Sequence, residues 1–358
     1  MIKGITRRAM YAALPGGLVA ASMLPVRERR ALPQVGEFFR FFDPATETVV
    51  VRLTSPATSG LLPAASNRFV SSKRRFLIFS SDRTGKRTPF QVDLRTGRLR
   101  QLAETAGLAP LSLCMDQTER FLYFIDRGAL KEVALANLRT RTLTEDVSAF
   151  TAGRSSSEFF VVRNGQLQQL ARAASTLADN IGSSFGPLLR PGGAGCFFLR
   201  DVSTDEREFW YAPLRDATSK PIVLAKGRVS NPIWSPDGRS LLFLREVQAN
   251  VLLSEVHEVF PETGAEQRVA PTSQFAAFAP NGDASVFVGA SRSKAQPNIV
   301  LLLRAVKREL TLCEHRASRP AAVSPVFSPD SRRVYFQSDH EGKSALYAVN
   351  VELLVEPT

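Results

Sequence analysis

The residues of this chain best suited to metal binding or acid–base chemistry are its three histidines, because imidazole titrates near neutral pH and is a common metal ligand. The three are far apart in the sequence. His257 falls in an apolar β-type run, His315 lies in a polar segment after another such run, and His340 lies in a short polar turn. We expect each to be solvent-exposed or on a strand surface, and none to bind a metal.

The three cysteines, Cys114, Cys196 and Cys313, offer no better candidate for chemistry. None has Cys-x-x-Cys spacing, and an odd number without a pattern predicts small buried residues rather than disulfides or a zinc site. The sequence also lacks a Gly-x-Ser-x-Gly elbow, a phosphate loop and a Gly-rich dinucleotide motif. The chain therefore has no signature of these common catalytic classes.

A repeated turn is the strongest structural signal in the sequence. Turns of the Ser-Pro-Asp-Gly type precede hydrophobic β-runs seven times, in units of roughly 40 to 48 residues. The clearest copies are residues 234–238, 278–282 and 327–331, and two weaker ones lie near residues 159–162 and 196–199. Units of this length are typical of four-stranded propeller blades. The sequence predicts an all-β fold, a seven-bladed β-propeller, with Asp237, Asp330 and Asp339 stabilising turns.

The last repeat is one strand short, and an additional strand, residues 48–54, precedes the first repeat. We expect this N-terminal strand to complete the seventh blade and close the ring, because closure removes exposed sheet edges. The predicted propeller domain covers residues 47–358.

The N-terminus has a different character. Residues 1–30 contain the pair Arg7-Arg8, a weakly apolar run and small residues near Ala20, with no acidic residue before Glu28. This pattern is typical of an export signal of the twin-arginine type, and an internal basic amphipathic segment is the alternative. We predict an export signal at residues 1–30 and a linker at residues 31–46. The protein is then periplasmic or secreted, soluble, and without membrane association once the signal is removed.

The charge of the chain favours anionic ligands. The formal net charge is +12, and about +7 remains when the basic residues 1–30 are left out. The predicted export, and the lack of a basic tract or a known binding motif, argue against nucleic acid as a partner. An acidic polysaccharide is a better match to the expected compartment.

Segments near both ends of the chain resemble the oligogalacturonide lyases, seven-bladed propellers related in architecture to the TolB-type propellers. The matching segments are residues 52–54, 67–69, 76–79 and 90–94 in the first repeat and residues 327–330 and 338–347 in the last. Residues 145–225 match only as generic blades. The resemblance implies β-elimination, in which a base removes the proton beside a uronate carboxyl and a cation neutralises the developing charge. It also implies a divalent metal, similar to manganese, held in the central channel by histidines and a glutamine.

The chain departs from the family at every expected metal ligand. The lyases have a His-Pro-His-Pro signature before the last turn, and the aligned stretch of this chain is Ala-Val-Ser-Pro, residues 322–325. The glutamine position falls on or near Arg319. The histidines expected before the sixth and fifth turns correspond to Phe275 and Asn231. We therefore predict no metal cofactor.

Arginine and amide side chains remain as candidate substrate-binding residues. Asn67 and Arg68 stand where the lyases have Gln-Lys, and Arg68 could bind a uronate carboxylate through two parallel hydrogen bonds, with an ordinary surface arginine as the alternative. Arg319 takes the glutamine position, Asn231 takes a histidine position, and Arg245 follows a predicted inner strand. A fixed guanidinium can in principle replace a metal as the neutralising charge.

Two functions from different classes follow. In the first, the chain is an exported lyase-like propeller that handles acidic oligosaccharides, by β-elimination if it is active. In the second, it is a non-catalytic TolB-like propeller that acts as a binding or protein-interaction module. The expected partner is an acidic oligosaccharide or a protein. Propellers support both, so the composition of the channel must distinguish them.

Overall fold

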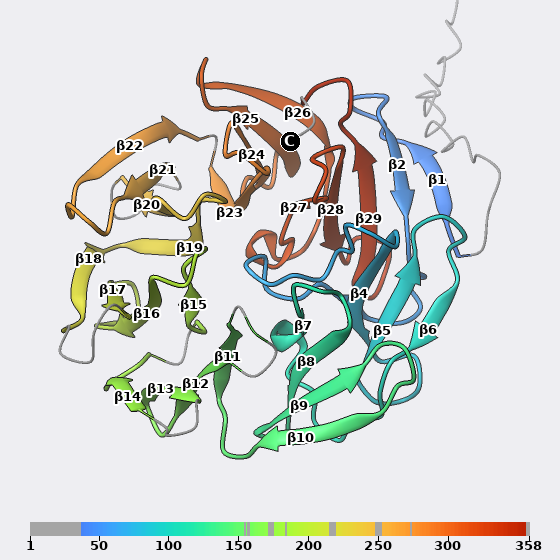
Figure 1. The fold of residues 1–358 in the computed structure, drawn as a ribbon. Coiled ribbons are helices and arrows are strands. Elements are labelled where there is room, and N and C mark those ends of the chain that lie inside the picture. Colours follow the sequence, from blue (N-terminus) through green and yellow to red (C-terminus); the bar gives the residue numbers. More distant parts are fainter. Residues whose placement is uncertain are drawn as a thin grey trace, which may run out of the picture.

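The computed structural model describes residues 37–153, 155, 158–170, 175–182, 185–214, 220–247, 253–272 and 274–355. These residues form seven sheets arranged in a ring around a central channel (Figure 1). The prediction of an all-β, seven-bladed propeller is confirmed. The export signal predicted at residues 1–30 lies outside the described residues, which contain no helix long and apolar enough to span a membrane.

Blades 1 to 3 are ordinary four-stranded antiparallel sheets, whose strands follow one another from the channel outward. Blade 1 contains β3 (Gly60–Leu61), β4 (Phe76–Ser81), β5 (Thr88–Asp93) and β6 (Leu99–Gln101). Blade 2 contains β7 (Cys114–Met115), β8 (Phe121–Asp126), β9 (Ala129–Ala134) and β10 (Thr140–Thr144). Blade 3 contains β11 (Ala149–Ala152), β12 (Phe159–Arg163), β13 (Gln166–Leu170) and β14 (Ser175–Ala178).

Blades 4 to 6 repeat the same order. Blade 4 contains β15 (Leu188–Leu189), β16 (Gly195–Asp201), β17 (Arg207–Pro213) and β18 (Ile222–Gly227). Blade 5 contains β19 (Val229–Trp234), β20 (Leu241–Glu246), β21 (Ser254–Val259) and β22 (Glu266–Pro271). Blade 6 contains β23 (Phe275–Pro280), β24 (Val286–Ser291), β25 (Asn298–Leu303) and β26 (Arg308–Glu314).

Blade 7 joins the two ends of the chain. Its strands β27 (Val326–Phe327), β28 (Arg333–Ser338) and β29 (Ala345–Asn350) come from the C-terminal end, and β2 (Val49–Arg52) and β1 (Phe39–Phe42) complete the sheet on the outside. Val50 pairs with Val349 and Val51 with Ala348. The predicted closure by an N-terminal strand is thus confirmed.

The segment predicted as a linker, residues 31–46, needs a correction. It contains strand β1, which pairs with β2 along its whole length, and Phe38 and Phe41 are buried. Burial of these two rings against the blade explains why residues 39–42 form a fifth strand. The propeller therefore begins before residue 47.

The repeated turns have the hydrogen bonds that their sequence predicts. In the blade 5 turn, Asp237 accepts hydrogen bonds from the Ser235 hydroxyl at 2.7 Å and from the Arg239 amide at 3.0 Å. Gly238 takes the left-handed φ of 69° that the turn requires. Asp330 makes the equivalent bonds to Ser328 and Arg332 in blade 7. These turns connect the inner strand of a blade to its second strand, and we call the side of the ring on which they lie the turn face.

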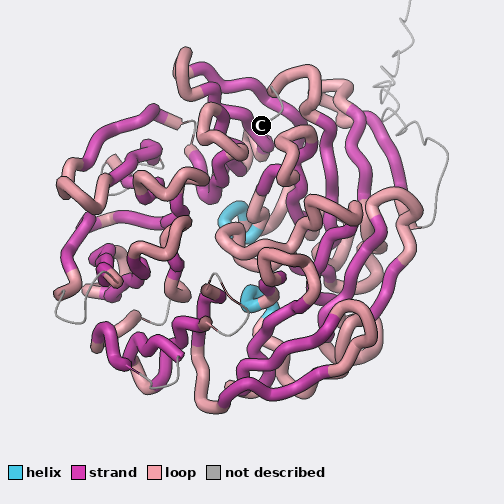
Figure 2. Tube along the Cα trace, in the orientation of Figure 1, coloured by secondary structure: helices cyan, strands magenta, loops and turns pink. Residues whose placement is uncertain are grey.

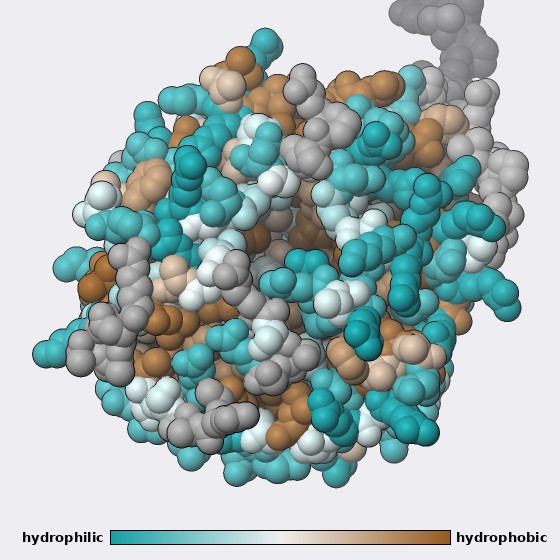
Figure 3. Space-filling view, viewed as in Figure 1, coloured by the Kyte–Doolittle hydropathy of each residue, from teal (hydrophilic) through white to brown (hydrophobic). Residues whose placement is uncertain are grey.

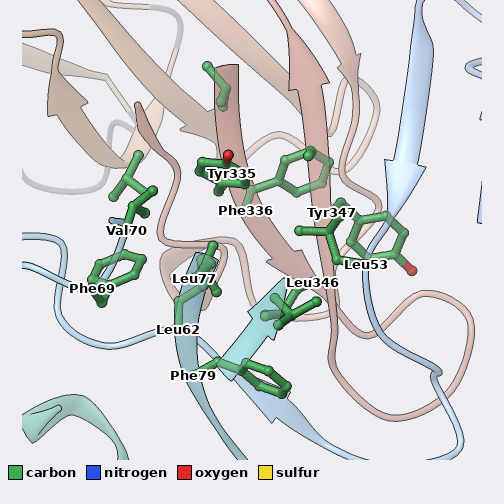
Figure 4. Close-up of a cluster of buried hydrophobic side chains, with 14 of the residues drawn as sticks. Leu53, Leu62, Phe69, Val70, Leu77, Phe79, Tyr335, Phe336, Leu346 and Tyr347 are labelled. Carbon is green, nitrogen blue, oxygen red and sulfur yellow. The ribbon is translucent and has the colours of Figure 1, made fainter. Parts of the chain in front are cut away.

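Hydrophobic side chains fill the interfaces between neighbouring blades. The largest core cluster extends over blades 6, 7, 1 and 2. Figure 4 shows its part between blades 1 and 7, where Leu77 and Phe79 of β4 lie near Tyr335 and Phe336 of β28 and Leu346 of β29. Packing of this kind fixes each blade relative to the next, and so it fixes the shape of the channel.

Shortening Val50 to alanine should lower the free energy of unfolding by about 2 kcal/mol, because the change removes buried methyl groups from the closing strand. Val50 is 2% exposed, whereas its neighbour Val49 is 39% exposed. Urea unfolding followed by circular dichroism measures the difference, with Val49→Ala as the matched control. Equal effects of the two substitutions would contradict the closing role of β2.

Candidate functional site

The central channel is surrounded by the seven inner strands, and three of these strands are interrupted. In blade 1, residues 62–68 separate β3 from the pairing of Val70 with Leu77. In blade 2, the 3-10 helix η1 (Pro110–Ser112) precedes β7, and in blade 7 the 3-10 helix η2 (Pro320–Ala322) precedes β27. Figure 2 shows both short helices near the centre of the ring. The interruptions bring loop residues of blades 1, 2 and 7 toward the channel.

The channel holds three cavities with volumes of about 270, 410 and 220 Å³. Their walls are mainly alanine, proline, leucine, isoleucine and phenylalanine, with a few serine, threonine and asparagine side chains. Among the described residues that line them, Arg68 is the only charged one. Figure 3 shows a recess near the centre of the ring, with hydrophobic residues visible behind a more polar rim. The channel thus combines an apolar wall with a single guanidinium.

Asn67 and Arg68 lie in the channel, as the sequence suggested, and they have different roles. The Asn67 amide donates hydrogen bonds to the carbonyls of Leu111 and Leu113 at 3.0 and 3.1 Å, which ties blade 1 to blade 2 beside η1. Arg68 is exposed and lines the cavity that opens at the turn face. Its guanidinium forms no ion pair with any residue in the described ranges. Arg68 is therefore available to an anion in the channel mouth.

Asn231 and Phe275 occupy positions where the lyase resemblance implies histidines. Asn231 has a left-handed φ of 53° at a bulge in β19, and its amide donates to the Ala276 carbonyl of blade 6 at 3.1 Å. Phe275 is completely buried, and its ring lies so close to Gly289 that a Cβ there would be 2.4 Å away. Both residues hold blades 5 and 6 together.

Arg245 lies outside the three channel cavities. Its guanidinium binds both carboxylate oxygens of Glu266 at 2.7 Å and also donates to the Lys226 carbonyl. Glu266 in turn contacts His257 Nδ1 at 2.8 Å. This cluster spans β20, β21 and β22, so Arg245 connects strands of blade 5 and its charge is already compensated.

Arg319 is exposed and immediately precedes η2. Burial opposes ionisation of the neighbouring Asp339, but hydrogen bonds from Ser318 and the charge of Arg319 together lower the pKa of Asp339 below its usual value. Asp339 accepts the Ser318 amide hydrogen bond at 2.8 Å, so it holds the loop before η2 as well as its own turn. Arg319 does not line any of the three channel cavities.

Residues 322–325, aligned with the lyase signature, are fixed by a side chain that sequence reasoning missed. Gln337 is 6% exposed, accepts a hydrogen bond from the Leu62 amide at 2.6 Å, and donates one to the Ala322 carbonyl. Val323 is fully buried, and its carbonyl accepts the Gln337 backbone amide. Gln337 directly follows the apolar run 334–336 of β28, and its partners Leu62 and Ala322 lie in two different blades, so the sequence contains no direct signal for its role.

The three histidines occupy separate environments. His257 lies between Glu255 and Glu266 on blade 5, and His340 contacts the Ser338 hydroxyl at 3.1 Å on blade 7. The prediction that all three lie at the surface is wrong for His315, which is completely buried. Its Nε2 lies 2.9 Å from the Ser291 carbonyl and its Nδ1 accepts the Ala317 amide, an arrangement that fits the neutral ring.

The donor set of the channel does not fit the divalent metal of the lyase resemblance. In the described part of the chain, no three histidine, cysteine, aspartate or glutamate side chains gather in a metal-binding group. Cys196 and Cys313 are buried and Cys114 is half-buried, all three as free thiols whose pKa is raised by burial. Hydroxyl and amide groups in the channel walls are weak ligands without such partners.

No protein-family model matches the sequence, and no curated protein matches it. Among solved structures, an oligogalacturonate lyase in complex with manganese gives a TM-score of 0.78 at 18% identity, covering 90% of this chain and 97% of that one. An oligogalacturonate lyase from Vibrio parahaemolyticus gives 0.77 at 18% identity, covering 90% and 98%. A puromycin-hydrolyzing peptidase from Mycobacterium tuberculosis gives 0.60 at 13% identity, covering 82% and 55%. The chain therefore has the fold of the oligogalacturonate lyases.

The buried His315 should make stability depend on pH. Burial lowers the pKa of His315 below its ordinary value of 6.5, despite the opposing hydrogen bond to Ser291. As the pH falls, His315 is therefore protonated at a higher pH in the unfolded chain than in the folded protein. The free energy of unfolding then decreases below pH 6.5, by at most about 1.4 kcal/mol per pH unit. Urea unfolding between pH 7 and the acidic range should show a smaller slope for His315→Gln. An unchanged slope in the variant would exclude this contribution.

Proposed function

We propose that this propeller is a binding module whose central channel holds a ligand without cleaving it. The supporting observation is the composition of the channel cavities, in which Arg68 is the only charged side chain among the described lining residues. β-Elimination needs a general base within hydrogen-bond reach of the substrate and a group that neutralises the carboxylate. Arg68 can supply the second group. The described lining contains no carboxylate, imidazole, lysine or tyrosine to supply the first.

The proposed ligand is an acidic oligosaccharide. The apolar walls suit the C–H faces of sugar rings, and the hydroxyls of Ser66 and Thr151 and the side-chain carbonyl of Asn67 can bond to sugar hydroxyls. Arg68 can bind one uronate carboxylate through two parallel hydrogen bonds. The basic, twin-arginine-type N-terminus supports placing this module outside the cytoplasm, where such saccharides occur.

A second candidate function is metal-free elimination, in which Arg68 neutralises the uronate carboxylate. The observation that favours it is the exposed guanidinium of Arg68 in the channel mouth, without an ion pair to any described residue. This candidate needs a base from outside the described cavity walls, whereas the binding function needs only the groups present.

Digalacturonate should bind to the purified domain, and Arg68→Ala should weaken binding by roughly tenfold or more, because a charge-assisted hydrogen bond contributes about 1.5–3 kcal/mol. Isothermal titration calorimetry measures the affinity. Arg139→Ala, which removes an exposed arginine from a hairpin of blade 2, is the matched control and should bind as the unaltered protein does. Incubation with digalacturonate, with or without a manganese salt, should yield no unsaturated product by mass or ultraviolet absorbance.

Each departure from these results has a distinct meaning. Absence of binding would rule out digalacturonate as a ligand and with it the acidic-saccharide proposal. Product that requires manganese would contradict the binding module. Product without metal that disappears in Arg68→Ala would establish the second candidate in its place.

A further inference from the structure

A groove between blades 7 and 1 lies on the turn face, beside the channel mouth and outside the channel itself. Its volume is about 470 Å³, which is within the usual range for small-molecule sites. Three arginines line it, Arg75 from blade 1 and Arg332 and Arg333 from blade 7. Ser72 adds a hydroxyl on the blade 1 wall, and Asn350 adds an amide on the blade 7 wall. Of these five residues, Ser72 also lines a channel cavity, and the other four line none of the channel cavities.

Sheet and turn hydrogen bonds hold the backbone of all three arginines. The Arg75 carbonyl accepts the Leu94 amide at 2.9 Å, and the Arg332 carbonyl accepts the Val351 amide at 2.9 Å. Arg333 is the first residue of β28, and its carbonyl accepts the Ser328 amide at 2.7 Å. Because the two turns belong to neighbouring, tightly packed blades, the three side chains start from fixed points on opposite walls of one groove.

Two carboxylates, Asp330 and Glu352, also line the groove, so its three arginines leave the lining with a formal charge of +1. Glu352 lies 3.6 Å from Arg332 and pairs with it. Burial opposes ionisation of Asp330, but hydrogen bonds from the Ser328 hydroxyl and the Arg332 amide lower its pKa, so it stays ionised and bound to its own turn.

The other two arginines have no such partner. Within the described ranges, neither Arg75 nor Arg333 forms an ion pair, and both are exposed. Lys73 and Arg74, in the same turn as Arg75, are exposed as well and add to the positive potential. Two guanidinium groups on opposite walls, together with a local excess of positive charge, form an arrangement that binds anions.

We propose that this groove is a second binding site, which takes a compact polyanion carrying two or more carboxylate or phosphate groups. Arg75, on the blade 1 wall, binds one anionic group of the ligand, and Arg333, on the blade 7 wall, binds another. The Asn350 amide donates a further hydrogen bond, whereas the Ser72 hydroxyl already donates to Glu119 at 2.8 Å. This site does not depend on the function proposed for the channel, because its three arginines and Asn350 line none of the channel cavities.

The test measures binding of citrate and of pyrophosphate at low ionic strength by isothermal titration calorimetry. The double variant Arg75→Gln/Arg333→Gln should raise the Kd of the bound probe by at least about tenfold. Added salt should weaken binding to the unaltered protein, because the site is exposed to solvent and screened. Citrate and pyrophosphate separate carboxylate from phosphate chemistry, and binding of either one supports the site.

Arg239→Gln is the matched control. Arg239 occupies the same turn position in blade 5 as Arg332 does in blade 7, as the equivalent bonds Ser235 to Ser240 and Ser328 to Arg333 show, but it does not line the groove. The control should bind the probe as tightly as the unaltered protein. The urea midpoint of each variant verifies that the variant is folded. If the double variant does not fold, Arg332→Gln serves as a second variant of the groove.

Three results would overturn the proposal. The first is that neither citrate nor pyrophosphate binds. The second is that the folded double variant binds the probe as tightly as the unaltered protein. The third is that Arg239→Gln weakens binding as much as the double variant does. The channel proposal is tested separately by digalacturonate. If digalacturonate binding depends on Arg68 but not on Arg75 and Arg333, the channel proposal stands regardless of the result for the groove.

Discussion

The pairing of β2 with β29 is the contact on which the rest of this structure depends, because it joins the two ends of the chain in one sheet. The Leu53 amide donates to the Leu346 carbonyl, and the Gly60 amide to the Ser344 carbonyl, so the connection continues from blade 7 into blade 1. An open ring would expose two sheet edges and the large core cluster between these blades. Once the ring is closed, seven inner strands surround one channel. The side chains on those strands then determine what the channel can bind.

In this protein, the polar side chains next to the channel mostly connect blades. Asn67 links blade 1 to blade 2, Asn231 links blade 5 to blade 6, and Gln337 links blade 7 to blade 1. Asn67 and Gln337 bond to backbone groups of the interrupted inner strands, and Asn231 bonds to the Ala276 carbonyl of β23. Leaving such buried groups unsatisfied costs about 1–3 kcal/mol each. Phe275 fills a position that the lyase resemblance assigns to a histidine. The channel therefore gains rigidity from groups that in an enzyme could act on a substrate, and Arg68 remains as its charged contact.

The blades could be predicted from sequence because turn chemistry is local: Ser235, Asp237 and Gly238 make the bonds of one turn within a few residues. The closing strand could be predicted because the last repeat is one strand short and an additional strand precedes the first repeat. Strand β1 was missed because its Phe-rich segment carries no turn signal and pairs only with β2. The partners of Arg245 and the burial of His315 could not be predicted either. Arg245 in β20 and Glu266 in β22 are separated by β21, and the pairing of β21 with β22 contains a register shift. The carbonyl that contacts His315 belongs to Ser291 in β24, which is distant in the sequence. Arg68 was identified by its position in the sequence, but only the structure shows that it forms no ion pair with a described residue.

The central proposal is that the channel binds its ligand without a metal ion, whereas one oligogalacturonate lyase of the same fold has been solved in complex with manganese. Titration of the purified domain with manganese chloride, followed by calorimetry and by the electron paramagnetic resonance signal of free Mn²⁺, tests this claim most directly. The account predicts that added Mn²⁺ stays free, with no saturable one-to-one binding, because the described channel walls offer no cluster of metal-ligating side chains. Stoichiometric binding that removes the free-ion signal would contradict it and would require a ligand set in the channel that the described residues do not form.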